Sequence, residues 1–151
     1  MKNKINKINK LFNLEINPMF INYKQNLYYL LAKTKNEDII FETKDNYFIF
    51  KNGTWNNGIW NNGIWIDGHW YNGTWIDGTW YNGTWNNGTW NNGTWENGIW
   101  ESGIWKNGIW SNGAWNNGTW NNGYILNKET NKYEYSELSP NKVKWSYSYQ
   151  E

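Results

Sequence analysis

The sequence contains no cysteine, one histidine and two prolines in 151 residues. Without cysteine, the chain can form neither a disulfide framework nor a thiolate metal site. Its fourteen basic residues are all lysine and are nearly balanced by thirteen acidic residues, which leaves a net charge of +1. Between Trp55 and Trp120 the chain has one lysine, Lys106. Because aromatic proteins that bind nucleic acid also need a cationic groove, this composition disfavours a nucleic-acid partner.

Long apolar runs are also missing. Residues 1–10 are basic, but the segment that follows, Leu11–Glu15, is not continuously apolar, so it resembles neither a secretory signal nor a transmembrane helix. The lysines that precede it could face an anionic membrane, although a solvated basic surface is the commoner arrangement and a membrane partner is disfavoured. We expect cytoplasmic synthesis, with export by another route or incorporation into a virion or larger assembly left open.

The repeat is poor in aliphatic residues, with no leucine and scattered isoleucine, and tryptophan takes their place. The chain has a single valine, Val143, but fifteen tryptophans, of which fourteen stand five residues apart from Trp55 to Trp120. Each of these fourteen is followed three residues later by glycine. Because so large a side chain must be packed or used as a contact surface, the core of the repeat must be aromatic.

The chain divides into an N-terminal leader or cap (1–49), a Trp-Asn-Gly pentapeptide repeat (50–124) and a C-terminal β-hairpin cap (125–151). Phe50 and Ile125 occupy the tryptophan phase at the two ends, as expected of capping units. Alternation in the last segment places Val143 and Trp145 on one face of a strand. Spacing predicts a helix over 5–16 and strands over 27–32, 38–43, 47–50, 124–126, 132–138 and 142–149.

The repeat itself predicts short strands. The residue before tryptophan is β-branched in twelve of fourteen units, which favours extended backbone. Asn-Gly follows in most units and is the strongest local signal for a two-residue hairpin turn. We therefore predict an all-β fold, an elongated twisted meander of antiparallel hairpins about 70 Å long at the usual strand spacing.

Two near-identical segments, Ile66–Trp75 and Ile76–Trp85, differ only where His69 is replaced by Thr79, and they suggest a ten-residue structural period. The alternative fold is a β-solenoid with tryptophan inside and asparagine ladders at the corners. We rank it second because a closed coil of ten residues is too narrow to hold indole rings. The shared period of five does not imply the pentapeptide-repeat family, whose square coils have small or aliphatic interior residues.

In a hairpin ribbon, all tryptophans would lie on one face, and the opposite face would carry the variable residue that follows each tryptophan. If function lies on the repeat, this variable column is the first candidate for a contact surface. The candidate contact residues are Ile66, Tyr71, Ile76, Tyr81, Glu96, Glu101 and Lys106.

The segment Tyr71–Gly78, repeated over Tyr81–Gly88, resembles the opening half of a MORN repeat (Y-x-G-x-W-x-x-G). That resemblance implies hairpins laid side by side in an elongated sheet, used for scaffolding, lipid association or assembly. The Asn-rich and Trp-rich units are also similar to short repeats of phage and bacterial surface proteins.

No catalytic constellation is visible. His69 replaces threonine in a duplicated segment, which indicates a tolerated surface substitution rather than a general base or metal ligand. Asp67 and Asp77 stand at turn positions, where aspartate tolerates positive φ. We therefore expect no enzyme activity, no catalytic residue, no cofactor and no metal site.

The function expected from these features is that of a non-enzymatic structural or assembly protein, a rigid β-repeat spacer that binds protein partners or copies of itself, in a virion or a cell-surface structure. The alternative is a glycan-binding adhesin or receptor-binding module that uses exposed tryptophans as platforms. Fourteen identical core positions explain the regularity better than fourteen ligand platforms would.

Overall fold

The computed structural model describes residues 40–44 and 47–145, and the predicted helix over 5–16 and strand over 27–32 lie outside this range. Two longer strands precede the repeat, one two-residue strand lies in each repeat unit, and two longer strands follow. The strands are β1 (Ile40–Lys44), β2 (Tyr47–Asn52), β3 (Thr54–Trp55), β4 (Ile59–Trp60), β5 (Ile64–Trp65), β6 (His69–Trp70), β7 (Thr74–Trp75), β8 (Thr79–Trp80), β9 (Thr84–Trp85), β10 (Thr89–Trp90), β11 (Thr94–Trp95), β12 (Ile99–Trp100), β13 (Ile104–Trp105), β14 (Ile109–Trp110), β15 (Ala114–Trp115), β16 (Thr119–Trp120), β17 (Gly123–Asn127) and β18 (Lys132–Ser136).

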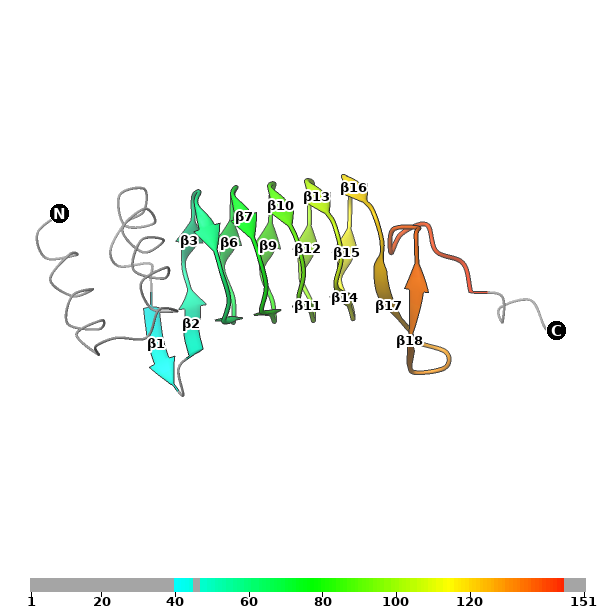
Figure 1. Cartoon of the computed structure of the whole chain (residues 1–151), viewed down its shortest axis with the longest axis horizontal. Coiled ribbons are helices and arrows are strands. Elements are labelled where there is room, and N and C mark those ends of the chain that lie inside the picture. The colour runs from blue at the N-terminus through cyan, green and yellow to red at the C-terminus, as the bar shows by residue number, and fades with distance from the viewer. Residues whose placement is uncertain (1–39, 45–46, 146–151) are drawn as a thin grey trace, which may run out of the picture.

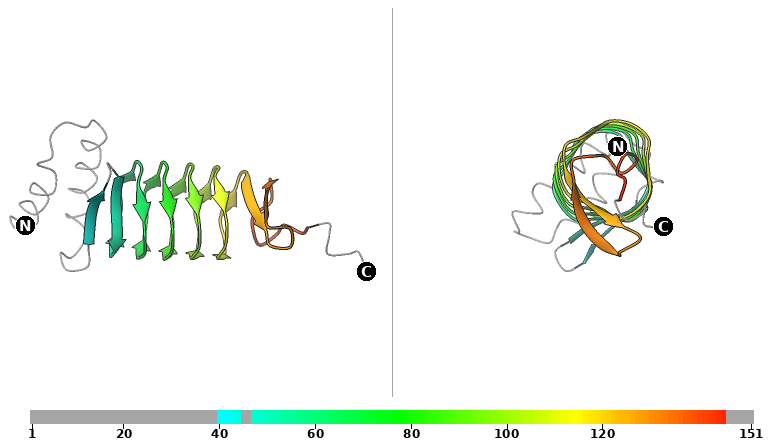
Figure 2. Two further views of the ribbon diagram at one scale, coloured as in Figure 1. Left: turned by 90° about the horizontal axis from the view of Figure 1, so that it is seen from below. Right: turned by 90° about the vertical axis from the view of Figure 1, so that its right-hand side faces the viewer.

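The chain winds into a parallel β-solenoid of about five turns (Figures 1 and 2). Each repeat unit forms one side of a coil, and three sides complete it, so that Trp55 pairs with Trp70 fifteen residues later. The sides stack into three sheets. Sheet A has the order β1-β2-β5-β8-β11-β14-β17-β18, sheet B the order β15-β12-β9-β6-β3, and sheet C the order β16-β13-β10-β7-β4.

The predicted antiparallel hairpin meander is therefore wrong, and the parallel solenoid, which was ranked second, is the observed fold. The structural period is fifteen residues, not ten. A coil of fifteen residues has room for indole rings that a ten-residue coil lacks. The near-identity of Ile66–Trp75 and Ile76–Trp85 has no structural counterpart, because residues ten apart do not pair. Where the two segments meet, β6 pairs with β9 at a separation of fifteen residues.

The corners of the coil explain why Asn-Gly does not form a hairpin here. A two-residue hairpin turn of the predicted type needs positive φ at both residues. In the solenoid, the fourteen glycines from Gly53 to Gly118 have φ between 114° and 134°, whereas Asn131 is the only other described residue with positive φ. At five corners the preceding Asn or Asp instead accepts a hydrogen bond from the glycine N–H, at 2.9 Å for Asn57 Oδ1 and 2.8 Å for Asp77 Oδ1. One glycine thus turns the chain from one sheet to the next.

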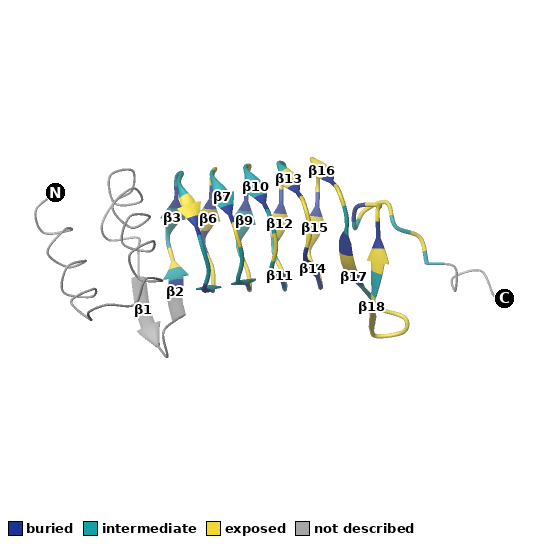
Figure 3. Ribbon diagram, viewed as in Figure 1, coloured by how far each residue is buried: buried dark blue, intermediate teal, exposed yellow. Residues whose placement is uncertain are grey.

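Indole rings fill the interior in three stacks, one behind each sheet. Figure 3 shows that buried positions recur on the strands of successive coils. Rings one coil apart lie nearly parallel, as in Trp85 and Trp100 with centroids 4.9 Å apart and an interplanar angle of 6°. Rings on successive sides meet edge to face, as in Trp85 and Trp90 at 5.9 Å and 75°. These ring contacts continue without a gap from Phe50 to Trp120. Each aromatic pair adds roughly 0.5 to 1.5 kcal/mol beyond the burial of its area.

Backbone hydrogen bonds join each coil to the next at the same two positions on each side. The N–H of the residue before tryptophan donates to a glycine carbonyl one coil earlier, as in Thr84 to Gly68 at 2.9 Å. The N–H of the residue after tryptophan donates to a tryptophan carbonyl, as in Asn86 to Trp70 at 2.7 Å. Because neighbouring strands are about 4.8 Å apart, five turns rise only about 24 Å, a third of the length expected for the hairpin ribbon.

Sheet A is closed at both ends by an antiparallel strand, β1 at one end and β18 at the other. Phe50 and Ile125 replace tryptophan in the stack of sheet A and are buried, as predicted for the ends of the repeat. Ser136 in β18 accepts a hydrogen bond from Trp120 Nε1 at 3.1 Å. Val143 and Trp145 pack against the end of the core, but residues 143–145 are not in a strand, so the strand predicted over 142–149 is wrong in its described part.

Candidate functional site

The outer surface of each sheet consists of two side-chain columns, because tryptophan between them points inward. One column, the Thr/Ile column, contains the residue before each tryptophan. The other, the variable column, contains the residue after it. The variable columns are Lys51, Ile66, Tyr81, Glu96, Ser111 and Leu126 on sheet A; Asn56, Tyr71, Asn86, Glu101 and Asn116 on sheet B; and Asn61, Ile76, Asn91, Lys106 and Asn121 on sheet C.

The predicted contact residues do not form one column, because a three-sided coil sends successive units to different sheets. Sheet A receives Ile66, Tyr81 and Glu96 on three successive coils. Sheet B receives Tyr71 and Glu101, separated by an asparagine, and Sheet C receives Ile76 and Lys106, again with an asparagine between them. Their role in binding stays a prediction, but only sheet A places such residues on adjacent coils.

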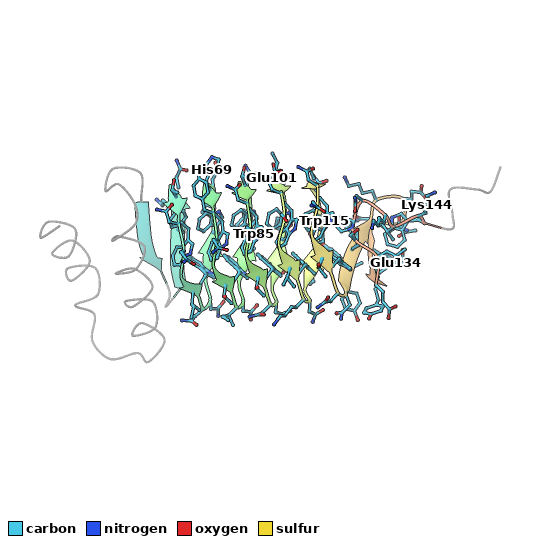
Figure 4. All side chains as sticks on the ribbon, turned by 90° about the horizontal axis from the view of Figure 1, so that it is seen from above. His69, Trp85, Glu101, Trp115, Glu134 and Lys144 are labelled. Carbon is cyan, nitrogen blue, oxygen red and sulfur yellow. The ribbon has the colours of Figure 1, made fainter. Side chains whose placement is uncertain are left out.

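Most of these side chains are accessible. Tyr71 and Tyr81 are exposed by 47% and 46%, and Ile66 by 40%. On sheet B, Glu101 Oε2 accepts a hydrogen bond from Asn116 Nδ2 at 3.0 Å, so this carboxylate is used within its own sheet. The ring of His69 lies 6.2 Å from that of Tyr71 on the same sheet. Figure 4 shows His69 and Glu101 on the outside of the coil, with Trp85 and Trp115 inside.

A ladder of asparagines runs along the corner between sheets A and B. Asn97 Nδ2 lies 3.5 Å from Asn82 Oδ1, and Asn112 Nδ2 lies 3.3 Å from Asn97 Oδ1. Lys128 Nζ extends the ladder by donating to Asn112 Oδ1 at 2.6 Å. The predicted solenoid alternative included such ladders, and they bind the exposed corners of successive coils to one another.

The C-terminal cap has surface features that the sequence did not single out. Ser111 is buried because its hydroxyl lies 2.8 Å from the hydroxyl of Tyr133, whose ring crosses from β18. Tyr124 and Tyr135 form an edge-to-face pair with centroids 5.9 Å apart. A shallow pocket of about 310 Å³ remains where the next corner of the coil would lie. Its lining includes Trp110, Asn112, Leu126, Lys128, Val143 and Trp145.

The repeat tryptophans offer no platform for a sugar. All fourteen are buried, and the most exposed, Trp120, reaches 9%. Four indole N–H groups donate to a corner carbonyl one coil further on, as in Trp100 Nε1 to Asn117 at 3.1 Å. The expectation of a glycan site built from exposed repeat tryptophans is therefore wrong, because the three-sided coil encloses these rings.

The remaining polar candidates also have structural positions. His69 is exposed on β6 in the Thr/Ile column, as predicted for a surface substitution. Asp67 and Asp77 lie at corners as predicted, but for a different reason: they accept the glycine N–H and do not adopt positive φ. Within the described residues, no three His, Cys, Asp or Glu side chains gather as metal ligands. The described part also has no helix with the length and apolarity to span a membrane.

In comparisons with known proteins, no family model, curated protein or solved structure matches this chain. The resemblance of Tyr71–Gly78 to a MORN repeat therefore stays a local likeness in sequence. The hairpin ribbon that it implied is the arrangement that the parallel coil overturns.

Proposed function

We propose that this protein is a non-enzymatic structural element, a rigid spacer of fixed length that holds two attachment points apart in a larger assembly. The observation that carries the proposal is the unbroken aromatic core. Each indole of the inner coils stacks on the coils before and after it and meets the next side edge to face. A core of this kind has no hinge, because bending would separate stacked rings on one side of the coil.

The two ends of the solenoid support attachment outside the repeat. β1 and β18 are both antiparallel and both extend sheet A, so further coils are not added there in the same parallel register. Fixed ends and a repeating middle are typical of proteins whose length is set by the number of repeats. In such a spacer, partners bind the ends, and the repeat determines how far apart they are held.

The test measures distance and rigidity together. The chain has no cysteine, so a pair placed at Asn52 and Lys128 can carry two spin labels. These positions lie at the same corner about five coils apart, so we expect a narrow distribution near 24 Å between the attachment points. Deleting one coil, residues 84–98, should shorten the distance by about 5 Å, and duplicating it should lengthen the distance by the same amount.

Deletion of residues 84–93 serves as the matched control. In the hairpin model these ten residues are one complete structural unit. In the solenoid they are only two of the three sides of a coil, so their removal shifts every later strand by two sides and moves β17 to another sheet. We therefore expect an altered direction of the C-terminal label with a smaller change in rise. A broad distance distribution in the full-length chain would contradict a rigid spacer, and a shortening near 14 Å on removal of fifteen residues would contradict the coil itself.

A further inference from the structure

The variable column of sheet A differs from the other two in the order of its residues. Four successive coils present Lys51, Ile66, Tyr81 and Glu96, so two apolar side chains stand next to each other with one positive and one negative charge at equal distances on either side. Ile66 and Tyr81 are exposed by 40% and 46%. In the variable columns of sheets B and C, asparagine separates the apolar residue from the charged one.

From this order we infer that sheet A is an interface between two copies of this chain, packed face to face with their axes antiparallel. A two-fold axis along the strands, passing between the coils of Ile66 and Tyr81, makes the column complementary to itself. Ile66 then faces Tyr81 of the second copy, and Lys51 faces Glu96 of the second copy. Each contact occurs twice, as a two-fold interface requires.

The Thr/Ile column of sheet A fits the same operation. The axis that pairs the variable columns also brings Ile64 opposite Thr79 of the second copy and Ile49 opposite Thr94. All four are uncharged, half-buried isoleucine or threonine side chains. The two sheet faces therefore meet with apolar and small polar contacts at the centre and charge pairs at the rim, which is the usual composition of a protein interface.

Sheets B and C lack this property. The variable column of sheet B has one charged residue, Glu101, and that of sheet C has one, Lys106. A two-fold axis across either face would set the charge against an uncharged residue or against its own copy. Glu101 is also hydrogen-bonded to Asn116 within its sheet, whereas Glu96 has no side-chain hydrogen bond among the described residues. Charge complementarity therefore selects sheet A.

The small area that the two sheet A faces would bury predicts a weak association. Five residues at about 3.3 Å and a strand spacing of about 4.8 Å give about 80 Å² per coil, or about 600 Å² in total for four coils of two copies. Stable complexes bury about 1,200 Å² or more, so the pair should dissociate when dilute and form near 0.1 to 1 mM. The pairing is separate from the proposed spacer role, because a rigid monomer would serve as a spacer equally well.

The decisive experiment mixes two charge variants of the full chain. Lys51→Glu and Glu96→Lys should each weaken self-association about tenfold in sedimentation velocity at low salt, because each places like charges opposite one another. Mixed together, the two variants should pair at least as tightly as the wild type, since glutamate at position 51 then meets lysine at position 96 of the other copy. An antiparallel arrangement predicts both the loss in each single variant and this rescue. A parallel arrangement sets position 51 against position 51 and position 96 against position 96, so it predicts no loss in either single variant.

Control variants separate the face from the fold. Glu101→Lys and Lys106→Glu change the same kinds of charge on sheets B and C and should leave self-association unchanged. Ile66→Asn should abolish it, while Ile76→Asn on sheet C should not, and far-ultraviolet circular dichroism establishes that each variant is folded. The inference is overturned if the wild type stays monomeric up to 1 mM, or if the mixed charge variants associate no better than either one alone.

Discussion

The inside and the outside of the coil follow opposite rules, although the same pentapeptide supplies both. Inside, one residue type fills fourteen successive positions, and the substitutes at the two ends, Phe50 and Ile125, are apolar as well. Outside, the variable columns accept isoleucine, tyrosine, asparagine, glutamate, lysine and serine. The backbone hydrogen bonds keep the same pattern from coil to coil, whichever residue occupies the outer position.

The difference shows which parts of the pentapeptide determine the fold. An interior ring must match the rings of neighbouring coils and of neighbouring sides at once, whereas an outer side chain faces solvent on one side. The glycine is restricted for another reason, since its conformation and the closeness of the coil below exclude a side chain. Tryptophan and glycine therefore define the coil, and the other positions are free to carry function.

The largest effect should come from a side chain at a corner. Gly83 has a φ of 118°, and a Cβ atom there would overlap the carbonyl oxygen of Gly68 in the coil below. Gly83→Ala should therefore lower the free energy of unfolding by roughly 3 kcal/mol or more, from unfavourable φ together with displaced backbone. Guanidinium unfolding followed by tryptophan fluorescence measures this loss.

The neighbouring Thr84→Ala is the matched control for the corner. It adds no strain, and Ala114 already occupies the equivalent outer position two coils further along sheet B. We expect a loss below about 1 kcal/mol. Equal costs for the two alanine variants would contradict the conclusion that the glycine, and not merely the unit around it, sets the corner.

Part of this fold could be predicted from the sequence, because the local signals are strong. β-Branched residues before tryptophan indicated extended backbone, and the shortage of aliphatic residues indicated an aromatic core; both are confirmed. The pairing could not be predicted in the same way. A five-residue period fits any coil made of whole units, and Asn-Gly fits both a hairpin and a corner. The number of sides depends on how indoles pack across the interior, which the linear sequence does not display.

The candidate surface was predictable as a set of positions but not as an arrangement. The residues after each tryptophan are on the outside, so the identification of an outer variable column holds. Their distribution among three sheets follows only from the fifteen-residue coil, which places Ile66 beside Tyr81 and separates Tyr71 from both. The contact between Ser111 and Tyr133 forms because β18 folds back against β17, and no spacing in the repeat indicates this.

A smaller effect should distinguish indoles within the interior. Trp100 Nε1 donates to the carbonyl of Asn117 at 3.1 Å, whereas the buried Nε1 of Trp85, stacked directly on Trp100, has no acceptor. Replacement by phenylalanine removes the same volume at both positions but a hydrogen bond at only one. Trp100→Phe should therefore cost about 1 kcal/mol more than Trp85→Phe in guanidinium unfolding.

Sheet C provides the control for position along the solenoid. There the bonded indole comes first: Trp75 Nε1 donates to Asn92, and the Nε1 of Trp90, stacked on it 4.7 Å away, has no acceptor. Trp75→Phe should thus be the costlier change. If the C-terminal member of each pair were always the costlier one, distance from the end of the solenoid, and not the hydrogen bond, would explain the result.

The smallest effect should come from the outer surface. Tyr71 is exposed by 47%, and asparagine occupies the same column of sheet B on the coils before and after it. Tyr71→Asn should change the free energy of unfolding by no more than about 0.5 kcal/mol, measured in the same way, because it leaves both the corner and the core unaltered. A loss above about 1 kcal/mol would mean that the ring contact with His69 stabilises the coil. In that case the outer columns would share the structural role of the inner ones, and the contrast between inside and outside would be one of degree.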